Sequence, residues 1–477
     1  MSVRRKPISR TAGVASLIAM SLLLSLSGCM VGPRYDRPAV ETPSDWHWKK
    51  ASLVEQAKNG LWWQVFKDPK LDELESLAME ANQDLKAAVA RVDESRALAR
   101  LSKSEFYPQI TSSPGFSRSE DSAHDFLPGA TGTPRGIRTP HNFFSLPVSL
   151  SYEIDAWGRI RKSVAAATDR AEARVADYHT IILTVTSDVA INYYLLHSLD
   201  AEADVLEHTL ALRKKSLELV TSQFKFGAID ALDVARAKTD VSTTLSDMSD
   251  VGRRRAETTH IIAILCGKPA TDFVIENKPL TLPPPEIPAD LPSMLLERRP
   301  DVVHAERLLA ASNEEIGVAR AAFFPRFSLT GSAGLESQEL TNLFNWQSTV
   351  WNFATGLAQP VFTGGRNKAN LEASRARYDQ ATAQYKQQVL VAFKDVEDAL
   401  AGIQFRAEQA KFQAEAVDAA REVTTLATKR YENGQVTYLD VVDAQRKQLE
   451  VELGASRILG QRLVSTIQLI KSLGGGW

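Results

Sequence analysis

The chain has 477 residues, of which 44% are hydrophobic and 24% charged, and its formal net charge is −2. Its two cysteines cannot form a disulfide framework, and without the four basic residues of the first 28 positions the net charge is −6, which argues against a nucleic-acid partner. The eight histidines are scattered and no Gly-rich phosphate loop follows a strand, so the sequence indicates neither a catalytic nor a metal site.

Residues 1–28 have the form of an export signal. A basic head precedes the apolar stretch "GVASLIAMSLLLSLSG", which is too short for a convincing membrane helix. The stretch "LSGC", which ends at Cys29, resembles the lipobox of bacterial lipoproteins, in which the cysteine becomes an acylated N-terminus. We therefore expect a covalent N-acyl and diacylglycerol lipid on Cys29 and no other cofactor. The alternative is that Cys29 only ends an ordinary signal.

A lipidated segment is expected over residues 29–70, followed by two copies of one structural unit. The copies cover residues 71–267 and 297–472, with a Pro-rich linker at 268–296 and a tail at 473–477. The aromatic phrases "WHWKK" and "LWWQVF" of the N-terminal segment favour packing against helices over a ligand site.

Each unit contains a run of 68 residues almost free of Pro and Gly, from Arg159 to Phe226 and from Arg366 to Asn433. Each run predicts a helix roughly 100 Å long. Shorter helices are expected over Leu71–Glu105 and Asp230–Cys266, which laid end to end match the long helix in length.

Four stretches have the alternating pattern of strands. Phe144–Ile154 alternates apolar and polar residues over 11 positions, about the length of a tilted strand across a bilayer, and Arg326–Glu336 repeats the pattern. Weaker candidates at Gln109–Arg118 and Val350–Phe362 complete two hairpins. Four strands cannot close a barrel, so closure requires other copies; two copies give a filled barrel of about 8 strands, and three give about 12 and a lumen.

The phrases "FKFGAIDALDVARAK" and "YENGQVTYLDVVDAQ" are copies of each other, 207 positions apart. Gly227 and Gly434 are expected to end the long helices in a left-handed conformation. The next helices are expected to start with an N-cap and a capping-box carboxylate, which are Asp230 with Asp233 and Thr437 with Asp440. The role of Asp440 stays open between a helix cap and a gate.

The stretch "LPSMLLERRPDVVHAERLLAASNEEIGVARAAFFPRFSLTGSAG", from Leu291 to Gly334, resembles a signature of TolC-type outer-membrane efflux channels, in the lipoprotein branch that serves resistance-nodulation-division pumps. The phrases "VGPRYDRP" and "LWWQVFKDPKLDELESLAMEANQDLKAAVARV" resemble the opening of the same family. The resemblance implies a mainly α fold with a transmembrane β part: a homotrimer with a 12-stranded barrel, four strands per chain, continued by a long periplasmic α-helical barrel with an internal two-fold repeat.

The resemblance also implies roles for residues near the two repeated phrases. Asp440 and Asp443 align with acidic rings at a periplasmic constriction, and Tyr431 and Asp233 align with a latch between helix pairs. Val436 stands where the best-known channel has an arginine, so a weaker latch is expected. The tips that would dock an adaptor protein are Gly227, Ala228, Gly434, Gln435 and Val436.

We therefore expect a non-enzymatic channel in the outer membrane of a Gram-negative bacterium, a passive exit duct for drugs or other small toxic compounds. The implied partners are two further copies, a periplasmic membrane fusion (adaptor) protein and an inner-membrane resistance-nodulation-division pump. A duct for type I protein secretion is the alternative, and a trimeric coiled-coil tether is a third. The lipobox and the Leu291–Gly334 signature favour efflux over secretion, and the alternating strands disfavour the tether. The sequence does not identify the exported compounds.

Overall fold

The computed structural model describes residues 30–48, 61–120, 140–281, 283–287 and 295–475. The predicted signal and its lipid site, Cys29, lie outside these residues. The chain divides into two compact units, and each unit contains parts of both predicted repeats. The sheet unit comprises Met1–Arg37, Glu94–Ala171 and Arg307–Thr382, and the helical unit comprises Pro38–Asp93, Glu172–Glu306 and Ala383–Trp477.

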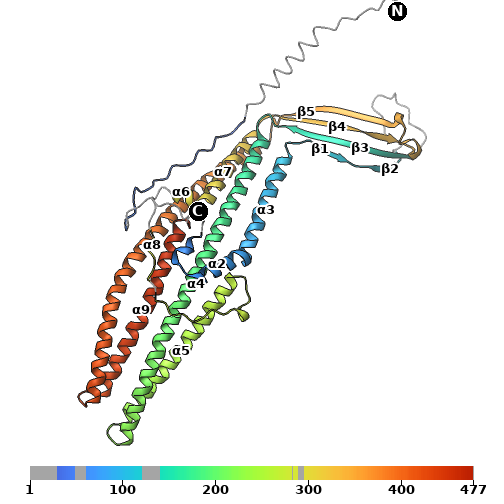
Figure 1. Ribbon diagram of the computed structural model, residues 1–477. Helices are drawn as coiled ribbons and strands as arrows, with labels where there is room; N and C mark the ends of the chain where they lie inside the picture. The colour runs from blue at the N-terminus through green and yellow to red at the C-terminus, as the bar shows by residue number, and fades with distance from the viewer. Residues whose placement is uncertain (1–29, 49–60, 121–139, 282, 288–294, 476–477) are drawn as a thin grey trace, which may run out of the picture. The chain divides into compact units, whose positions relative to one another are not determined.

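The sheet unit is built on one antiparallel sheet with the order β1-β3-β4-β5, in which β2 also pairs with β3 (Figure 1). The strands are β1 (Gln109–Ser112), β2 (Gly115–Ser119), β3 (His141–Ile154), β4 (Arg326–Ser337) and β5 (Thr349–Ala358). The four predicted strands are therefore present, but the first is broken before Gly115, because Pro114 has no N–H to donate to the ladder. Ile110 lies opposite Leu150 and Phe116 opposite Phe144, so β1 and β2 keep one register.

The two faces of the sheet differ in polarity. Leu146 of β3 lies opposite Leu335 of β4, and on β5 the exposed residues of the same face include Trp351, Phe353 and Leu357. The other face carries small and polar residues, of which Ser149, Ser151, Ser328, Thr330, Ser332 and Asn352 are examples. The predicted alternation is thus continued across all strands by the register.

The end of the sheet near Ile154 is fixed to the first turn of α4 (Arg159–Lys225). The Asp155 carboxylate accepts hydrogen bonds from the amides of Ile160 and Arg161 at 3.0 and 2.9 Å, which caps the helix start. Arg159 forms ion pairs with Glu153 at 2.8 Å and Glu105 at 3.0 Å. These contacts hold the strands to the helices within the sheet unit.

The helices have closely matched lengths in the two repeats. α4 and α8 (Arg366–Glu432) each have 67 residues, and α5 (Ala231–Leu265) and α9 (Tyr438–Ser472) each have 35. The bounds of α4, α8 and α5 lie within a residue of the predicted ones. The remaining helices and short 3-10 turns are η2 (Trp62–Phe66), α2 (Pro69–Ala81), α3 (Gln83–Ser104), η3 (Ala270–Asp272), α6 (Leu295–Arg298), α7 (Pro300–Ala321), η5 (Leu340–Asn342) and η6 (Trp346–Ser348). In the described part of the chain, no helix combines the length and the apolar character that a membrane crossing requires.

The single helix predicted over Leu71–Glu105 is wrong, because the chain breaks at Asn82 between α2 and α3. The Asn82 backbone is not helical, with φ −59° and ψ 131°. Its side-chain oxygen accepts hydrogen bonds from the amides of Asp84 and Leu85, and its amide group donates to the carbonyl of Leu265 at 2.8 Å. Asn82 therefore caps α3 and joins it to the end of α5.

The main core of the helical unit lies where α2, α4, α5 and α9 meet. Tyr193 and Ile467 are almost fully buried there, together with Trp62, Trp63 and Cys266. Trp46 is buried in a second cluster against α8 and α9. The predicted packing role of these tryptophans is confirmed. Cys266 is a free cysteine and is buried in the same core.

Candidate functional site at the helix turns

The two turns that end α4 and α8 have the same backbone geometry. Gly227 has φ +72° and Gly434 has φ +71°, in the left-handed region that favours glycine. The amides of Ala228 and Gln435 donate to the carbonyls five residues earlier, both at 2.9 Å, which is the hydrogen bond of a Schellman motif. A Cβ at either glycine would meet no atom within 4 Å, so backbone conformation and not crowding requires glycine here.

The residues at the tips of both turns face solvent. Gly227, Ala228, Gly434 and Gln435 are exposed, and Val436 is partly buried. The neighbouring Phe226, which sequence reasoning did not single out, is 86% exposed. A comparison of the two repeated phrases could have identified it, because the residue equivalent to Phe226 in the second phrase is the polar Asn433. A large exposed aromatic residue thus distinguishes the first turn from the second.

Asp440 caps the start of α9. Its carboxylate accepts hydrogen bonds from the Thr437 amide at 2.9 Å and the Thr437 hydroxyl at 2.6 Å. These hydrogen bonds lower the pKa of Asp440 from its usual value. Asp443 lies one turn further along the exposed side of α9, and the described residues provide no hydrogen-bond or ion-pair partner for it.

The capping box predicted at the first turn is wrong, although Asp230 is the N-cap of α5. The Asp233 carboxylate instead accepts from Arg236 at 3.1 Å. The residue equivalent to Arg236 in the second turn is Asp443, so the first turn has a neutral ion pair where the second has two carboxylates. The acidic charge is therefore concentrated at the second turn.

Tyr431 links α8 to α4 near the turns. Its hydroxyl donates to the side-chain oxygen of Gln223 at 2.6 Å, and the structure contains no hydrogen bond between Tyr431 and Asp233. Burial raises the pKa of Tyr431, and the nearby charge of Asp233 raises it further. The Tyr431 ring packs against Tyr438 with centroids 5.5 Å apart. Gln223, which sequence reasoning did not single out, is therefore the hydrogen-bond partner of the Tyr431 hydroxyl.

Two buried carboxylates hold α9 against α4 and α5, and sequence reasoning missed both. Asp240 accepts from Arg446 at 2.9 Å and its side chain is 6% exposed. Glu202, whose side chain is 2% exposed, pairs with Arg457 at 3.1 Å and Arg254 at 3.3 Å. The partners in the Arg446 and Arg457 pairs are more than 200 positions apart, and no local pattern predicts such a pair.

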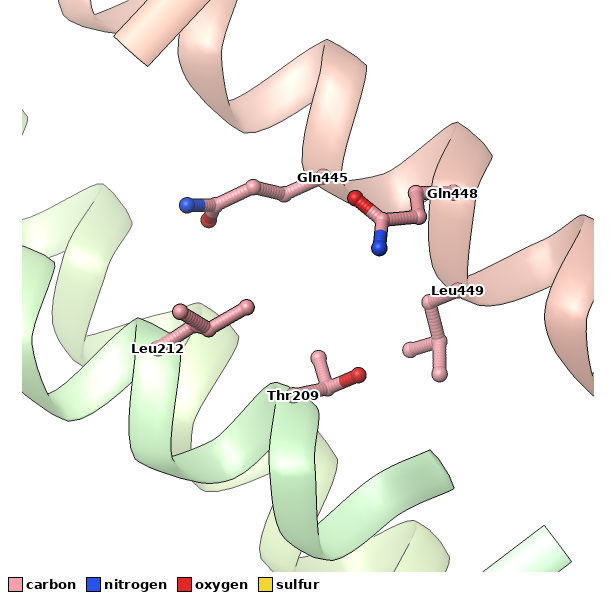
Figure 2. A pocket seen from close by; sticks show the side chains of 5 residues that line it. All are labelled: Thr209, Leu212, Gln445, Gln448 and Leu449. Carbon is pink, nitrogen blue, oxygen red and sulfur yellow. The ribbon is translucent and has the colours of Figure 1, made fainter. Parts of the chain in front are cut away.

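The remaining seam between α4 and α9 is partly polar. Figure 2 shows Gln445 and Gln448 of α9 facing Thr209 and Leu212 of α4 across a small pocket. The Gln445 amide donates to the Ser216 hydroxyl at 3.4 Å. Between the main core and the turns, the helix pairs are therefore joined by separate polar links and small apolar clusters. No group of three or more potential metal ligands occurs among the described residues.

A sheet with one apolar face, in a chain with paired helices of matched length, is the architecture that the sequence analysis expects of an outer-membrane channel. The sequence profile of the outer membrane efflux protein family matches residues 74–267 and 291–475, and the chain belongs to this family.

The chain is 33% identical to the solvent efflux pump outer membrane protein SrpC of Pseudomonas putida, over 96% of this chain and 98% of the relative. It is 32% identical to the cation efflux system protein CusC of Escherichia coli O6:H1, over 97% and 98%. The solved structure of the outer-membrane channel OprN superimposes with a TM-score of 0.87 at 28% identity, over 94% of this chain and all of that one. The predicted family, its mainly α fold with a sheet, its efflux function and its outer-membrane location are confirmed.

Proposed function

We propose that three copies of the chain form a passive exit duct, with the sheets closed into one 12-stranded barrel and the long helices into a periplasmic tunnel. The observation that carries the proposal is the sheet. It has one apolar and one polar face, and among the described residues the outer edges of β1, β2 and β5 pair with no other strand. Unpaired edges are costly in lipid, and edge pairing between copies satisfies them.

The helical unit supports assembly independently of the sheet. A stripe of apolar side chains along α8 is about half exposed in the single chain, and its spacing keeps it on one side of the helix. It consists of Leu390, Phe405, Phe412, Val423 and Leu426. Exposed apolar stripes of this length mark protein contacts, and the occupant proposed here is a neighbouring copy.

We propose that Cys29 carries the lipid, which is the only covalent addition that the duct requires. The residues that follow it are held against the sheet unit. The Val31 amide donates to the Trp157 carbonyl at 3.1 Å, and the Pro33 carbonyl accepts from Asn313 at 3.4 Å. The described residues that follow Cys29 therefore lie close to the start of α4.

The proposed partners are a periplasmic adaptor protein at the exposed tips and an inner-membrane pump that selects the cargo. One named relative belongs to a solvent efflux pump and the other to a cation efflux system, and this chain is about one-third identical to each. Similar channel proteins therefore serve chemically different cargoes, which supports a duct that does not itself select its cargo. We propose that the chain catalyses no reaction.

The assembly is tested by light scattering in mild detergent, followed by single-channel recording in planar bilayers. A trimer that conducts ions is expected. Because the barrel and the tunnel are completed between copies, no stable folded monomer is expected. A well-folded monomer, or a trimer that forms no conducting pore, would refute the proposal.

A further inference from the structure

The two hairpins of the sheet are register-matched copies of each other. The first strands are equivalent at an offset of 217 positions and the second strands at 207, which are the offsets between Pro108 and Pro325 and between Arg159 and Arg366. Ile110 lies opposite Leu150, and their equivalents Phe327 and Leu357 also lie opposite each other.

The match continues to the far end of the hairpins. Phe116 lies opposite Phe144, and the equivalent residues Ala333 and Trp351 form a pair as well. The repeat therefore extends to single-residue register in both hairpins, in spite of the break before Gly115.

The contact between the two hairpins inside one chain joins β3 to β4. This seam pairs the second strand of one hairpin with the first strand of the next, in a register that places Val148 opposite Ala333 and Ile154 opposite Phe327. The two outer strands of the sheet are β5 and the strand formed by β1 and β2 (Figure 1). In the repeat, β5 is equivalent to β3, and the β1–β2 strand is equivalent to β4. A neighbouring copy that meets these edges thus repeats the combination already present within the chain.

We infer that β5 of one copy pairs with the β1–β2 strand of the next copy. Its register is that of the β3–β4 pairing, moved to the equivalent residues by the offsets of 207 and 217 positions. This inference rests on the trimeric assembly proposed above. Within β5, the transfer places Thr355 opposite Phe116 of the next copy. Beyond the end of β5 at Ala358, the same register brings Val361 level with Ile110 of the next copy. On the polar face it places Ala354 opposite Ser117 of the next copy.

The side chains at the two edges suit this register. Val361, Leu357, Ile110 and Phe116 are 93%, 65%, 66% and 61% exposed in the single chain. The transferred register brings them to one face, where they continue the apolar belt across the seam. On the other face it places Gly356 opposite Gly115, so the two positions without side chains meet. A slip by one residue would turn one edge's apolar residues to the polar face.

The register is tested by disulfide crosslinking of the full-length protein. Directly opposite residues of antiparallel strands have Cα atoms about 4.5–5.5 Å apart, within the range of a disulfide, whereas neighbours two residues along are too far apart. The test pair is Ala354→Cys with Ser117→Cys. The two positions lie on strands separated by β3 and β4 within one chain, so only a bond between copies can form.

The controls keep the same face and shift the register by two residues in either direction. They are Ala354→Cys with Ser119→Cys and Asn352→Cys with Ser117→Cys, and Cys266 is too buried to compete. Oxidation of the test pair is expected to give reducible dimers and trimers on denaturing gels, with at least about ten times more product than either control.

The reduced form of every variant is first checked for trimers by light scattering. A trimer in which a control pair crosslinks better than the test pair, or in which no pair crosslinks, would overturn the register but leave the duct standing. A monomer that also fails to crosslink would refute both the register and the assembly.

Discussion

Asp440 and Asp443 lie three residues apart on α9, but their side chains have different surroundings. Asp440 is engaged by Thr437, while Asp443 is exposed and has no partner in the described part of the chain. The first residue therefore stabilises the helix start in each copy. In the proposed trimer, the second would contribute its charge to a ring around the threefold axis.

Neutralising each carboxylate separately should distinguish these roles. Asp443→Asn should weaken block of the channel by trivalent cations by about tenfold, because a constriction concentrates the field of its charges, and it should leave thermal stability unchanged. Asp440→Ala should lower the thermal midpoint, because the cap is lost. Single-channel recording and thermal unfolding in detergent give the two readouts. Equal effects of both variants on both readouts would contradict the division.

Glu75 is a buried carboxyl group in the core of the helical unit. It is fully buried, and neither of its oxygens has a hydrogen-bond partner in the structure. Burial raises its pKa well above the ordinary value, and the neighbouring Asp72 raises it further. The group is therefore neutral in the folded protein at pH values where it is ionised in the unfolded chain.

Stability should depend on pH through this group. The folded protein retains a proton that the unfolded chain releases, so stability is full below the ordinary Glu pKa and falls as pH rises toward the raised one, by at most about 1.4 kcal/mol per pH unit. Glu75→Gln should remove this slope and raise the thermal midpoint at pH 8. The exposed Glu80→Gln is the matched control. A wild-type slope that persists in Glu75→Gln would rule out this residue as its source.

At the scale of secondary structure, α9 is fastened to α4 and α5 by charged groups on both sides. The Asp240 carboxylate is buried and Arg446 is about half exposed. The buried Arg213 donates to the backbone carbonyl of Asp240 at 3.0 Å. Burial lowers the pKa of the Arg213 guanidinium, and the nearby Asp240 opposes this effect. Removing one partner from such a group leaves the other without compensation.

A double-mutant cycle measures this fastening. Arg446→Ala should destabilise the trimer by about 1–3 kcal/mol, less than for a fully buried pair because Arg446 is half exposed and Arg213 remains. Adding Asp240→Asn should recover part of the loss. The control is Arg253→Ala, which removes only exposed ion pairs and should change stability little. Additive effects of the two substitutions would show that the pair is not coupled.

The sequence predicted the long elements well because their signals are local and repeated. The runs almost free of Pro and Gly identified α4 and α8, and the alternation of Phe144–Ile154 identified β3. The break at Asn82 was not predictable in this way, because its reason is a hydrogen bond to Leu265, 183 positions away. At the turns, glycine and N-cap positions were correct. The pairing of Asp233 with Arg236 was not predictable, because the sequence does not tell whether the Asp233 carboxylate accepts from the Asp230 amide or from the Arg236 side chain.

For the whole molecule, the proposed anchoring has two parts, a lipid on Cys29 and the apolar face of the sheet. The lipid is attached at one point of the chain, whereas the apolar face extends over all strands of the sheet. The sheet should therefore dominate retention in the membrane.

Cys29→Ala, expressed behind a cleavable signal without a lipobox, should still fractionate mainly with outer membranes. The reason is that the strands remain able to insert after the lipid is lost. Membrane fractionation with immunodetection gives the distribution of the variant. Mass spectrometry of the wild-type protein shows whether Cys29 carries acyl groups. Recovery of the variant as a soluble periplasmic protein would mean that the lipid and not the sheet anchors the chain.

The equal lengths of α4 and α8 limit which insertions and deletions the gene can tolerate. Deleting seven residues from α8 alone would shift Gly434 by about 10 Å along the helix axis relative to Gly227, because each helical residue adds about 1.5 Å. The Tyr431–Gln223 and Arg446–Asp240 contacts would then lose their partners together. Length changes in one long helix should therefore be viable only with an equal change in the other, and tunnel length would evolve in paired steps.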